Sequence, residues 1–214
     1  MEPSSESLAP RSHTPRRIIL ASTSPYRRQL LERLHIPFDT VDPIVDEAPL
    51  QRSGLSATDL TRALAEAKAH AVGKMRRDDL IIGCDQCVAL DGLLLGKPGS
   101  LDAAVEQLML LSGRTHQLVT ALCLLDAHTQ LCATTVDVVE MTLRPLTAQQ
   151  IRRYVEIDRP IDCAGSFRIE SLGVALFEHV LCEDPTAIVG LPLMRLVSML
   201  QDAGVDVFEA ASGK

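Results

Sequence analysis

The segment STSPYRR, residues 22–28, places small hydroxyl side chains beside two adjacent arginines, directly after the apolar run 18–21. Ser24 followed by Pro25 is typical of a helix N-cap with proline in the first turn. A helix N-terminus presents free backbone N–H groups, and arginine supplies forked donors that match phosphate oxygens. The segment therefore suits an oligophosphate. An ordinary capped helix with solvated arginines is the alternative interpretation.

Two acidic residues could work on such a ligand. Asp85 comes directly after the apolar run 80–84, and the end of a buried strand is a common location for an acid that faces a ligand. It could bind a divalent metal or accept a proton from water, and a turn-capping aspartate is the alternative. Glu47 lies in the acidic loop 42–55. Together the two carboxylates could hold Mg²⁺, but the sequence alone does not place them side by side.

Further cations occur in weaker patterns. Lys97 lies between Gly96 and Pro98 at the exit of a predicted strand, outside any phosphate-binding loop pattern. Lys68 belongs to an alanine-rich helix, from which its long stem could reach a cleft. Arg114 lies in the polar turn 112–116, which a glycine helix cap also explains.

The histidines and cysteines favour no other chemistry. His116, His128 and His179 have no convincing catalytic partners in the sequence, so we interpret them as structural. Six scattered cysteines are typical of buried thiols in a reducing compartment. Cys84 and Cys87 form a C-x-x-C pair, but they continue an apolar strand instead of opening a helix, and a second pair that would complete a zinc site is missing from the sequence.

Composition limits the class of protein. The chain has 214 residues, of which 46% are hydrophobic and 3% aromatic, without tryptophan. We therefore expect an aliphatic core and a mixed α/β fold. The net charge of −7 disfavours broad nucleic-acid binding, although a small anion could still bind where a few cations meet. No apolar run is long enough to span a bilayer, so we expect a soluble, cytoplasmic protein without a membrane partner.

Hydrophobic periodicity and capping residues predict the elements that must position these side chains. The predicted strands are 18–21, 38–41, 80–84, 88–95 as a hairpin across Asp91-Gly92, 115–126, 130–144 and 172–180. The predicted helices are 25–34, 58–75 capped by Thr58, 101–111 capped by Ser100, 147–158 with a Thr147/Gln150 capping box, and 192–203. At least two hairpins occur among strands that otherwise alternate with helices, so we expect a mixed sheet.

One domain of about 17–205 is predicted, flanked by tails. Residues 1–16 are rich in serine, proline and arginine and lack an apolar core, so we interpret them as a flexible tail and not as a signal peptide. Residues 206–214 are expected to form a C-terminal tail.

Taken as a set, these stretches resemble one family, the Maf-type nucleoside triphosphate pyrophosphatases. The resemblance extends from about Ile18 to Leu200. It is carried, in order, by LASTSPYRR at 20–28, Asp46-Glu47, Lys68, GCDQ at 83–86, GKP at 96–98, SGRTH at 112–116, CAGSF at 163–167 and GLPL at 190–193.

The resemblance implies a two-lobed α/β fold around a central cleft, related to the inosine-triphosphate pyrophosphatases. It implies hydrolysis of a nucleoside triphosphate to the monophosphate and pyrophosphate with a divalent metal, Mg²⁺ or Mn²⁺. It identifies Asp85 as the proton acceptor and, with Glu47, as a metal ligand. Lys68 and Lys97 are expected to be catalytic. The residues expected to bind substrate are Ser22, Ser24, Arg27, Arg28 and Arg114.

Three positions separate the branches of this family. The branch that acts on dTTP and UTP usually has Arg, Thr and Gln where this chain has Tyr26, Gln86 and Glu170. The chain is more similar to the 7-methyl-GTP pyrophosphatase branch. A 7-methylguanine base is positively charged, so the Tyr26 ring could attract it by about 1–2 kcal/mol, and Glu170 could accept from guanine donors.

Three alternatives stay open. A nucleotide-binding regulator of septum formation would bind the triphosphate without hydrolysing it. The pyrimidine-specific branch would hydrolyse dTTP or UTP. A thiol oxidoreductase based on Cys84 and Cys87 is a more distant alternative. The resemblance does not decide whether the protein is a homodimer.

Overall fold

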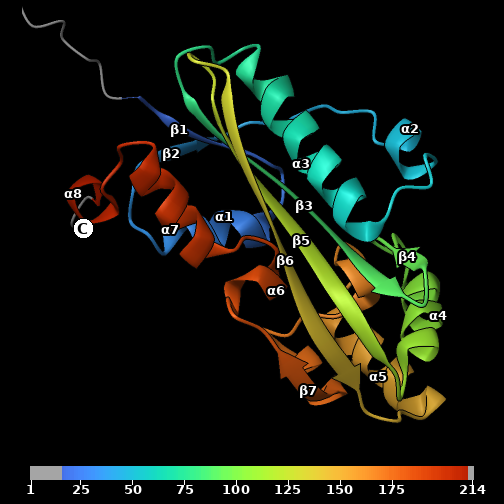
Figure 1. Cartoon of the computed structure of the whole chain (residues 1–214). Helices are drawn as coiled ribbons and strands as arrows, with labels where there is room; N and C mark the ends of the chain where they lie inside the picture. The colour runs from blue at the N-terminus through green and yellow to red at the C-terminus, as the bar shows by residue number, and fades with distance from the viewer. Residues whose placement is uncertain (1–15, 212–214) are drawn as a thin grey trace, which may run out of the picture.

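A seven-stranded mixed sheet forms the centre of this computed structural model, which describes residues 16–211 (Figure 1). The strands are β1 (Ile18–Ala21), β2 (Phe38–Thr40), β3 (Leu80–Leu90), β4 (Leu93–Leu95), β5 (Thr115–Asp126), β6 (Leu131–Leu143) and β7 (Phe177–Leu181). Their order is β2-β1-β3-β5-β6-β7, with β4 paired to β3. Strand β1 is parallel to β2 and β3, whereas β3, β5, β6 and β7 are antiparallel neighbours. The predicted mixed α/β class is confirmed.

Serine and threonine caps start three of the longer helices as the sequence predicts. The helices are α1 (Pro25–Glu32), α2 (Ala48–Gln51), α3 (Ala57–Gly73), α4 (Leu101–Leu111), α5 (Ala148–Asp158), α6 (Thr186–Val189), α7 (Leu193–Asp202) and α8 (Val207–Ala210), with 3₁₀ turns η1 (Ala164–Ser166) and η2 (Leu172–Leu176). Ser24 and Ser100 accept from backbone amides of the first turns, and Thr147 forms its capping box with Gln150. Within 16–211, no helix is both long and apolar enough to cross a membrane.

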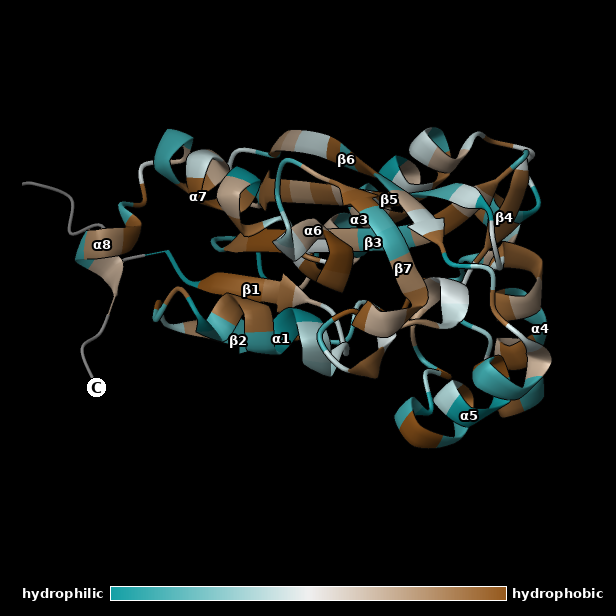
Figure 2. Ribbon diagram, turned by 90° about the horizontal axis from the view of Figure 1, so that it is seen from below, coloured by the Kyte–Doolittle hydropathy of each residue, from teal (hydrophilic) through white to brown (hydrophobic). Residues whose placement is uncertain are grey.

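The two faces of β1 and β3 pack against different helices, which explains their continuous apolar runs. Ile18 and Leu20 pack with leucines of α1 and α7. Ile19 and Ala21 pack under α3, on the other face. Figure 1 shows α3 and α7 on opposite sides of the sheet, with α4 and α5 at its far end, and Figure 2 shows the apolar character of β1. The largest fully buried side chains are Ile, Leu and Met, so the predicted aliphatic core is confirmed.

Strand β3 has a gap along one edge. Strand β1 pairs with Leu80–Gly83, and β4 pairs with Val88–Leu90 on the same strand. Residues 84–87 lie between these two partners, while on the opposite edge all of them pair with β5. The gap leaves room for side chains from other elements to reach the middle of β3, where Asp85 and Gln86 lie.

Helix α3 approaches β3 closely because small residues face each other. A Cβ atom added to Gly83 would lie 2.2 Å from the carbonyl oxygen of Ala65 and 2.9 Å from the amide nitrogen of Ala69. Ala65 and Ala69 are themselves fully buried. The absence of a side chain at Gly83 therefore sets the height of α3 above the strand that carries Asp85.

Several predicted boundaries were wrong for local reasons. The cap of α3 is Ser56, whose Oγ accepts from the Asp59 amide at 3.1 Å, and Thr58 lies inside the first turn. The loop 42–55 contains the short helix α2. The predicted strand 172–180 begins as the 3₁₀ turn η2 and becomes a strand only at Phe177.

The predicted tails differ in outcome. Residues 1–15 and 212–214 lie outside the described residues, so the flexible N-terminal tail stays a prediction. Residues 206–211 are not simply a tail, because Asp206 caps α8 by accepting from the amides of Phe208 and Glu209. Val207 and Ala210 then pack against the cluster formed by α1, α7 and the sheet.

Replacing Gly83 with alanine tests the contact between α3 and β3. We expect Gly83→Ala to lower the free energy of unfolding by about 3 kcal/mol, because backbone atoms of α3 cannot yield as a flexible side chain would. Urea denaturation measures the loss. Gly96→Ala is the matched control, since an added Cβ there meets no atom within 4 Å. Equal stability of the two variants would contradict the close packing.

A buried histidine should make stability depend on pH. His116 is 2% exposed and packs against the rings of Phe167 and Phe177, and burial lowers its pKa from 6.5 to about 4. Below pH 6.5 the unfolded chain therefore binds this proton more readily than the folded protein. Stability should fall as pH falls from 6.5 to about 4, by about 3 kcal/mol in total, and this contribution should level off below that.

The variant His116→Phe should lack this part of the pH dependence. Denaturant unfolding at several pH values between 4 and 7 measures it. Phe167→Leu is the control, because it alters packing around the same ring without removing the titrating group. That variant should shift stability by a similar amount at every pH, and an unchanged pH slope in His116→Phe would refute the assignment.

Candidate active site

A cleft of about 540 Å³ opens over the middle of β3, beside the gap in its edge. Nine of the twelve residues that the sequence predicts as site residues line it. These are Ser24, Tyr26, Arg27, Glu47, Lys68, Asp85, Gln86, Lys97 and Glu170. They come from α1, the loop before α2, α3, β3 and the segments that follow β4 and η1, so the fold joins stretches that are far apart in the chain.

Lys68 connects the two predicted acids. Its Nζ lies 2.6 Å from an Asp85 oxygen and 2.7 Å from a Glu47 oxygen. The stem of Lys68 runs from α3, whose close contact with β3 at Gly83 holds it over Asp85. Lys68 and Asp85 are nearly buried, whereas Glu47 is partly exposed. The sequence alone did not place the two carboxylates together, and the structure does.

The environment of Asp85 alters its proton affinity. Burial raises the pKa of the Asp85 carboxyl above its ordinary value, although the charges of Lys68 and Arg27 oppose the shift. A carboxylate with a raised pKa is a stronger proton acceptor than one in water. Asp85 therefore combines the basicity and the access to a cleft that a general base needs.

Arg27 binds the backbone of β3 within the gap in its edge. Its Nη1 donates to the carbonyl oxygen of Cys84 at 3.0 Å, and its Nε donates to that of Gly190 at 2.9 Å. Gly190 has φ 109° and ends α6, and an added Cβ would lie 3.3 Å from Arg27 Nε. The guanidinium is thus fixed at the cleft wall with its positive charge near Asp85.

Gln86 is held by its amide nitrogen. Nε2 donates to Thr120 Oγ1 at 2.8 Å and to the carbonyl oxygen of Ala187 at 2.9 Å. The amide therefore has one defined orientation, in which Oε1 is the atom that can accept from a ligand. The role of Gln86 in choosing a ligand stays a prediction.

Tyr26 lies within a second group of polar side chains. Its hydroxyl donates to Asp162 at 3.1 Å, and the Arg168 guanidinium carbon lies 5.2 Å from its ring centroid. Arg168 in turn lies 3.5 Å from a Glu170 oxygen. We call Tyr26, Asp162, Arg168 and Glu170 the base-end cluster, after the predicted contact of Tyr26 and Glu170 with a nucleobase. Asp162 and Arg168 are the two members that the sequence analysis missed, because no local pattern marks either of them.

Three predicted residues lie outside the cleft lining. Ser22 is buried and its Oγ accepts from the Ser24 amide at 3.1 Å, so it shapes the turn. Arg28 is exposed and pairs with Glu32 at 3.0 Å, one helical turn away. Arg114 pairs with Asp91 at the turn after β3. The substrate-binding roles predicted for Arg28 and Arg114 therefore have no support in this arrangement.

The two acids fit a divalent cation. Glu47 and Asp85 already share one cation, the Lys68 ammonium, so their oxygens converge on a single point. Mg²⁺ is commonly held by one or two carboxylates together with substrate phosphates and water. Within 16–211, three or more His, Cys, Asp or Glu side chains nowhere come together as a metal site. A metal here would therefore need ligands from the substrate.

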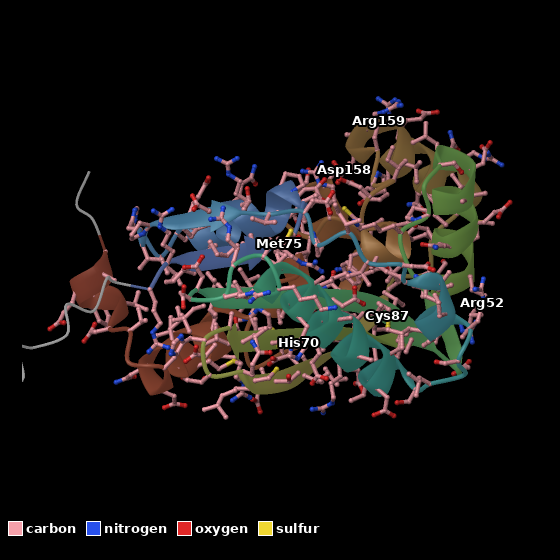
Figure 3. The ribbon with its side chains drawn as sticks, turned by 90° about the horizontal axis from the view of Figure 1, so that it is seen from above. Arg52, His70, Met75, Cys87, Asp158 and Arg159 are labelled. Atoms are coloured by element: carbon pink, nitrogen blue, oxygen red, sulfur yellow. The ribbon has the colours of Figure 1, made fainter. Side chains whose placement is uncertain are left out.

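The C-x-x-C pair lacks the properties of a redox centre. Burial raises the pKa of Cys84 to about 11 and that of Cys87 to about 12, so both stay protonated near neutral pH. Cys84 packs into the apolar layer beneath α1 and α7. Cys87, labelled in Figure 3, lines the cleft from β3. The geometry gives the thiol oxidoreductase alternative no support.

The sequence is similar to those of known proteins over most of its length. The chain matches the model of the family described as Maf-like protein over residues 17–203. A 7-methyl-GTP pyrophosphatase of Pseudoalteromonas atlantica is 47% identical over 193 residues, covering 90% of this chain and 98% of that protein. Proteins of the same name from Pseudomonas aeruginosa and Cupriavidus pinatubonensis are 45% and 46% identical over 190 and 194 residues, covering 89% and 91% of this chain and 98% and 96% of theirs. The chain therefore belongs to the Maf family.

Proposed function

We propose that this protein is a nucleoside triphosphate pyrophosphatase that hydrolyses 7-methyl-GTP to 7-methyl-GMP and pyrophosphate. The observation that carries the proposal is that one cleft contains two groups of side chains. One is the buried Asp85 paired with Lys68. The other is the Tyr26 ring with the acids Asp162 and Glu170. Relatives that are named 7-methyl-GTP pyrophosphatases and align over nearly the whole chain support it.

The charged residues divide the work of hydrolysis. A water molecule attacks the α-phosphorus and loses its proton to Asp85, while the bond between the α-phosphorus and the bridging oxygen breaks. Pyrophosphate leaves with the electron pair of that bond. Lys68, Lys97 and Arg27 neutralise the phosphate oxygens, and such preorganised charge usually contributes most of the catalysis in phosphoryl transfer.

The acids that face Lys68 also suit a cofactor. Glu47 and Asp85 would hold Mg²⁺ or Mn²⁺, which would supply further positive charge to the triphosphate.

The expectations of a cytoplasmic location, of no nucleic-acid partner and of a possible homodimer stay predictions. A regulator that only binds the nucleotide is distinguished from the enzyme by product analysis, because it would leave the triphosphate intact after long incubation.

Removing the proton acceptor should abolish most of the activity. We expect Asp85→Asn to lower turnover of 7-methyl-GTP at least about a hundredfold, because an amide cannot accept the proton of the attacking water. Chromatography of monophosphate and pyrophosphate measures the products. Asp137→Asn is the matched control, since Asp137 is also a buried carboxylate but lies on β6, paired with Arg195. Near-normal turnover by Asp85→Asn would exclude Asp85 as the base.

The preference of the enzyme among nucleobases should depend on Glu170. We expect Glu170→Gln to lower kcat/KM for 7-methyl-GTP about tenfold, since a charge-assisted hydrogen bond becomes a neutral one. The assay compares 7-methyl-GTP, GTP, UTP, dTTP and CTP with Mg²⁺ or Mn²⁺. Glu156→Gln, on the exposed face of α5, is the charge-matched control. A wild-type preference for neutral GTP would refute the role of charge, and one for UTP or dTTP would favour the pyrimidine branch.

A further inference from the structure

The base-end cluster contains more charge than the recognition of a base by Glu170 requires. Asp162 and Glu170 each contribute a negative charge, and Arg168 contributes one positive charge. Asp162 contacts the hydroxyl end of Tyr26, whereas Arg168 lies over the ring. Two charges of opposite sign therefore lie against Tyr26, the aromatic side chain on which the base is proposed to stack.

Tyr26 is fixed by the Asp162 contact. Burial, and then Cys163 and Asp162, raise the pKa of the Tyr26 hydroxyl, so it stays protonated and donates to the carboxylate. Asp162 also accepts from Cys163 Sγ at 3.5 Å. Because Asp162 lines the cleft, its charge faces any base that stacks on Tyr26.

The backbone of Arg168 makes close contacts, whereas its guanidinium makes longer ones. Its amide donates to Tyr154 Oη at 2.9 Å, and a Cβ added to Gly173 would lie 2.2 Å from its carbonyl oxygen. The guanidinium, by contrast, makes contacts of 3.4 Å to the Asp158 carbonyl oxygen and 3.5 Å to Glu170. Asp158, at the end of α5, is labelled in Figure 3. The positive charge of Arg168 is thus tethered beside Tyr26 and Glu170.

A charge beside a binding site changes the affinity for a charged ligand but hardly changes that for a neutral ligand of the same shape. The base of a purine nucleotide methylated at N7 carries one positive charge, and the base of the parent nucleotide is neutral. The ratio of the two affinities therefore reports on the electrostatic field at Tyr26, while losses of shape or packing affect both ligands.

We propose that Asp162 and Arg168 are further specificity-determining residues that act in opposite directions. Asp162 increases the preference for a positively charged purine over the neutral one, and Arg168 limits it while orienting Tyr26 and Glu170. The base-end cluster keeps one negative charge in excess, which a cationic base neutralises. This inference rests on the proposed function for the placement of the base at Tyr26.

Two charge-removing variants test the proposal. Asp162→Asn keeps an oxygen that can accept from Tyr26, and Arg168→Met keeps an unbranched side chain that can pack on the ring. Calorimetry gives the dissociation constants of 7-methyl-GMP and GMP for each protein. We expect the preference for 7-methyl-GMP to fall about fivefold in Asp162→Asn and to rise about fivefold in Arg168→Met. Asp78→Asn and Arg153→Gln, two exposed changes elsewhere, should leave it unchanged.

Salt provides a second readout that a purely structural role would not move. The effects of both variants should shrink as the salt concentration rises from about 0.05 M to about 0.5 M, because partly exposed charges are screened. A fall of the preference in both variants, a change of less than about twofold in either, or the absence of binding by both ligands would overturn the proposal.

The proposed function has a separate outcome. Binding of monophosphates requires no hydrolysis, so the affinity ratios judge the charge proposal even if the wild-type protein hydrolyses no triphosphate. Failure of hydrolysis with intact, opposite shifts in affinity would reject the pyrophosphatase and retain the charge-based selection of the base.

Discussion

The ion pair between Lys68 and Asp85 is the contact on which the candidate site depends. The Lys68 ammonium and the Asp85 carboxylate are nearly buried, so they tolerate little displacement. If they separated, each charge would lack a partner in the protein interior, which solvates charges poorly. Their separation is decided by the distance between α3 and β3. That distance in turn depends on a glycine facing two alanines. The position of the Lys68 charge thus follows from the smallest side chains in the core.

This arrangement also explains why Asp85 can be both buried and chemically useful. A buried carboxyl without a partner would be protonated, and one with a strong fixed partner would be a poor base. Lys68 is shared with Glu47, so its charge is divided between two acids. A triphosphate that enters the cleft offers Lys68 further anionic partners.

Much of the fold could be predicted from local signals, and the site less completely. Local sequence patterns predict the helix caps and the two long strands of the hairpin. The caps are Ser24, Ser100 and Thr147, and the strands are β5 and β6. The choice between Arg27 and Arg28 is harder, since consecutive residues on a helix point about 100° apart and only one can face the cleft. The i,i+4 pair of Arg28 with Glu32 was a usable signal that Arg28 faces outward.

The base-end cluster could not be predicted in the same way. Tyr26 and Asp162 are 136 positions apart, and no periodicity connects them. The backbone of Arg168 contacts the Tyr154 side chain of α5 and Gly173 of η2. These contacts depend on how two segments pack and not on either segment alone. Residue types predict which chemistry is available, whereas long-range packing decides which side chains share it.

The gap in β3 has a consequence for the protein in a crowded solution. A stretch of strand without a neighbour can recruit a strand from another molecule, and this is one route to aggregation. Here the Cys84 carbonyl oxygen is covered by Arg27, whose side chain also binds the end of α6. The guanidinium therefore occupies a place that a foreign backbone amide would need. The gap beside the cleft therefore offers a foreign strand one backbone acceptor fewer.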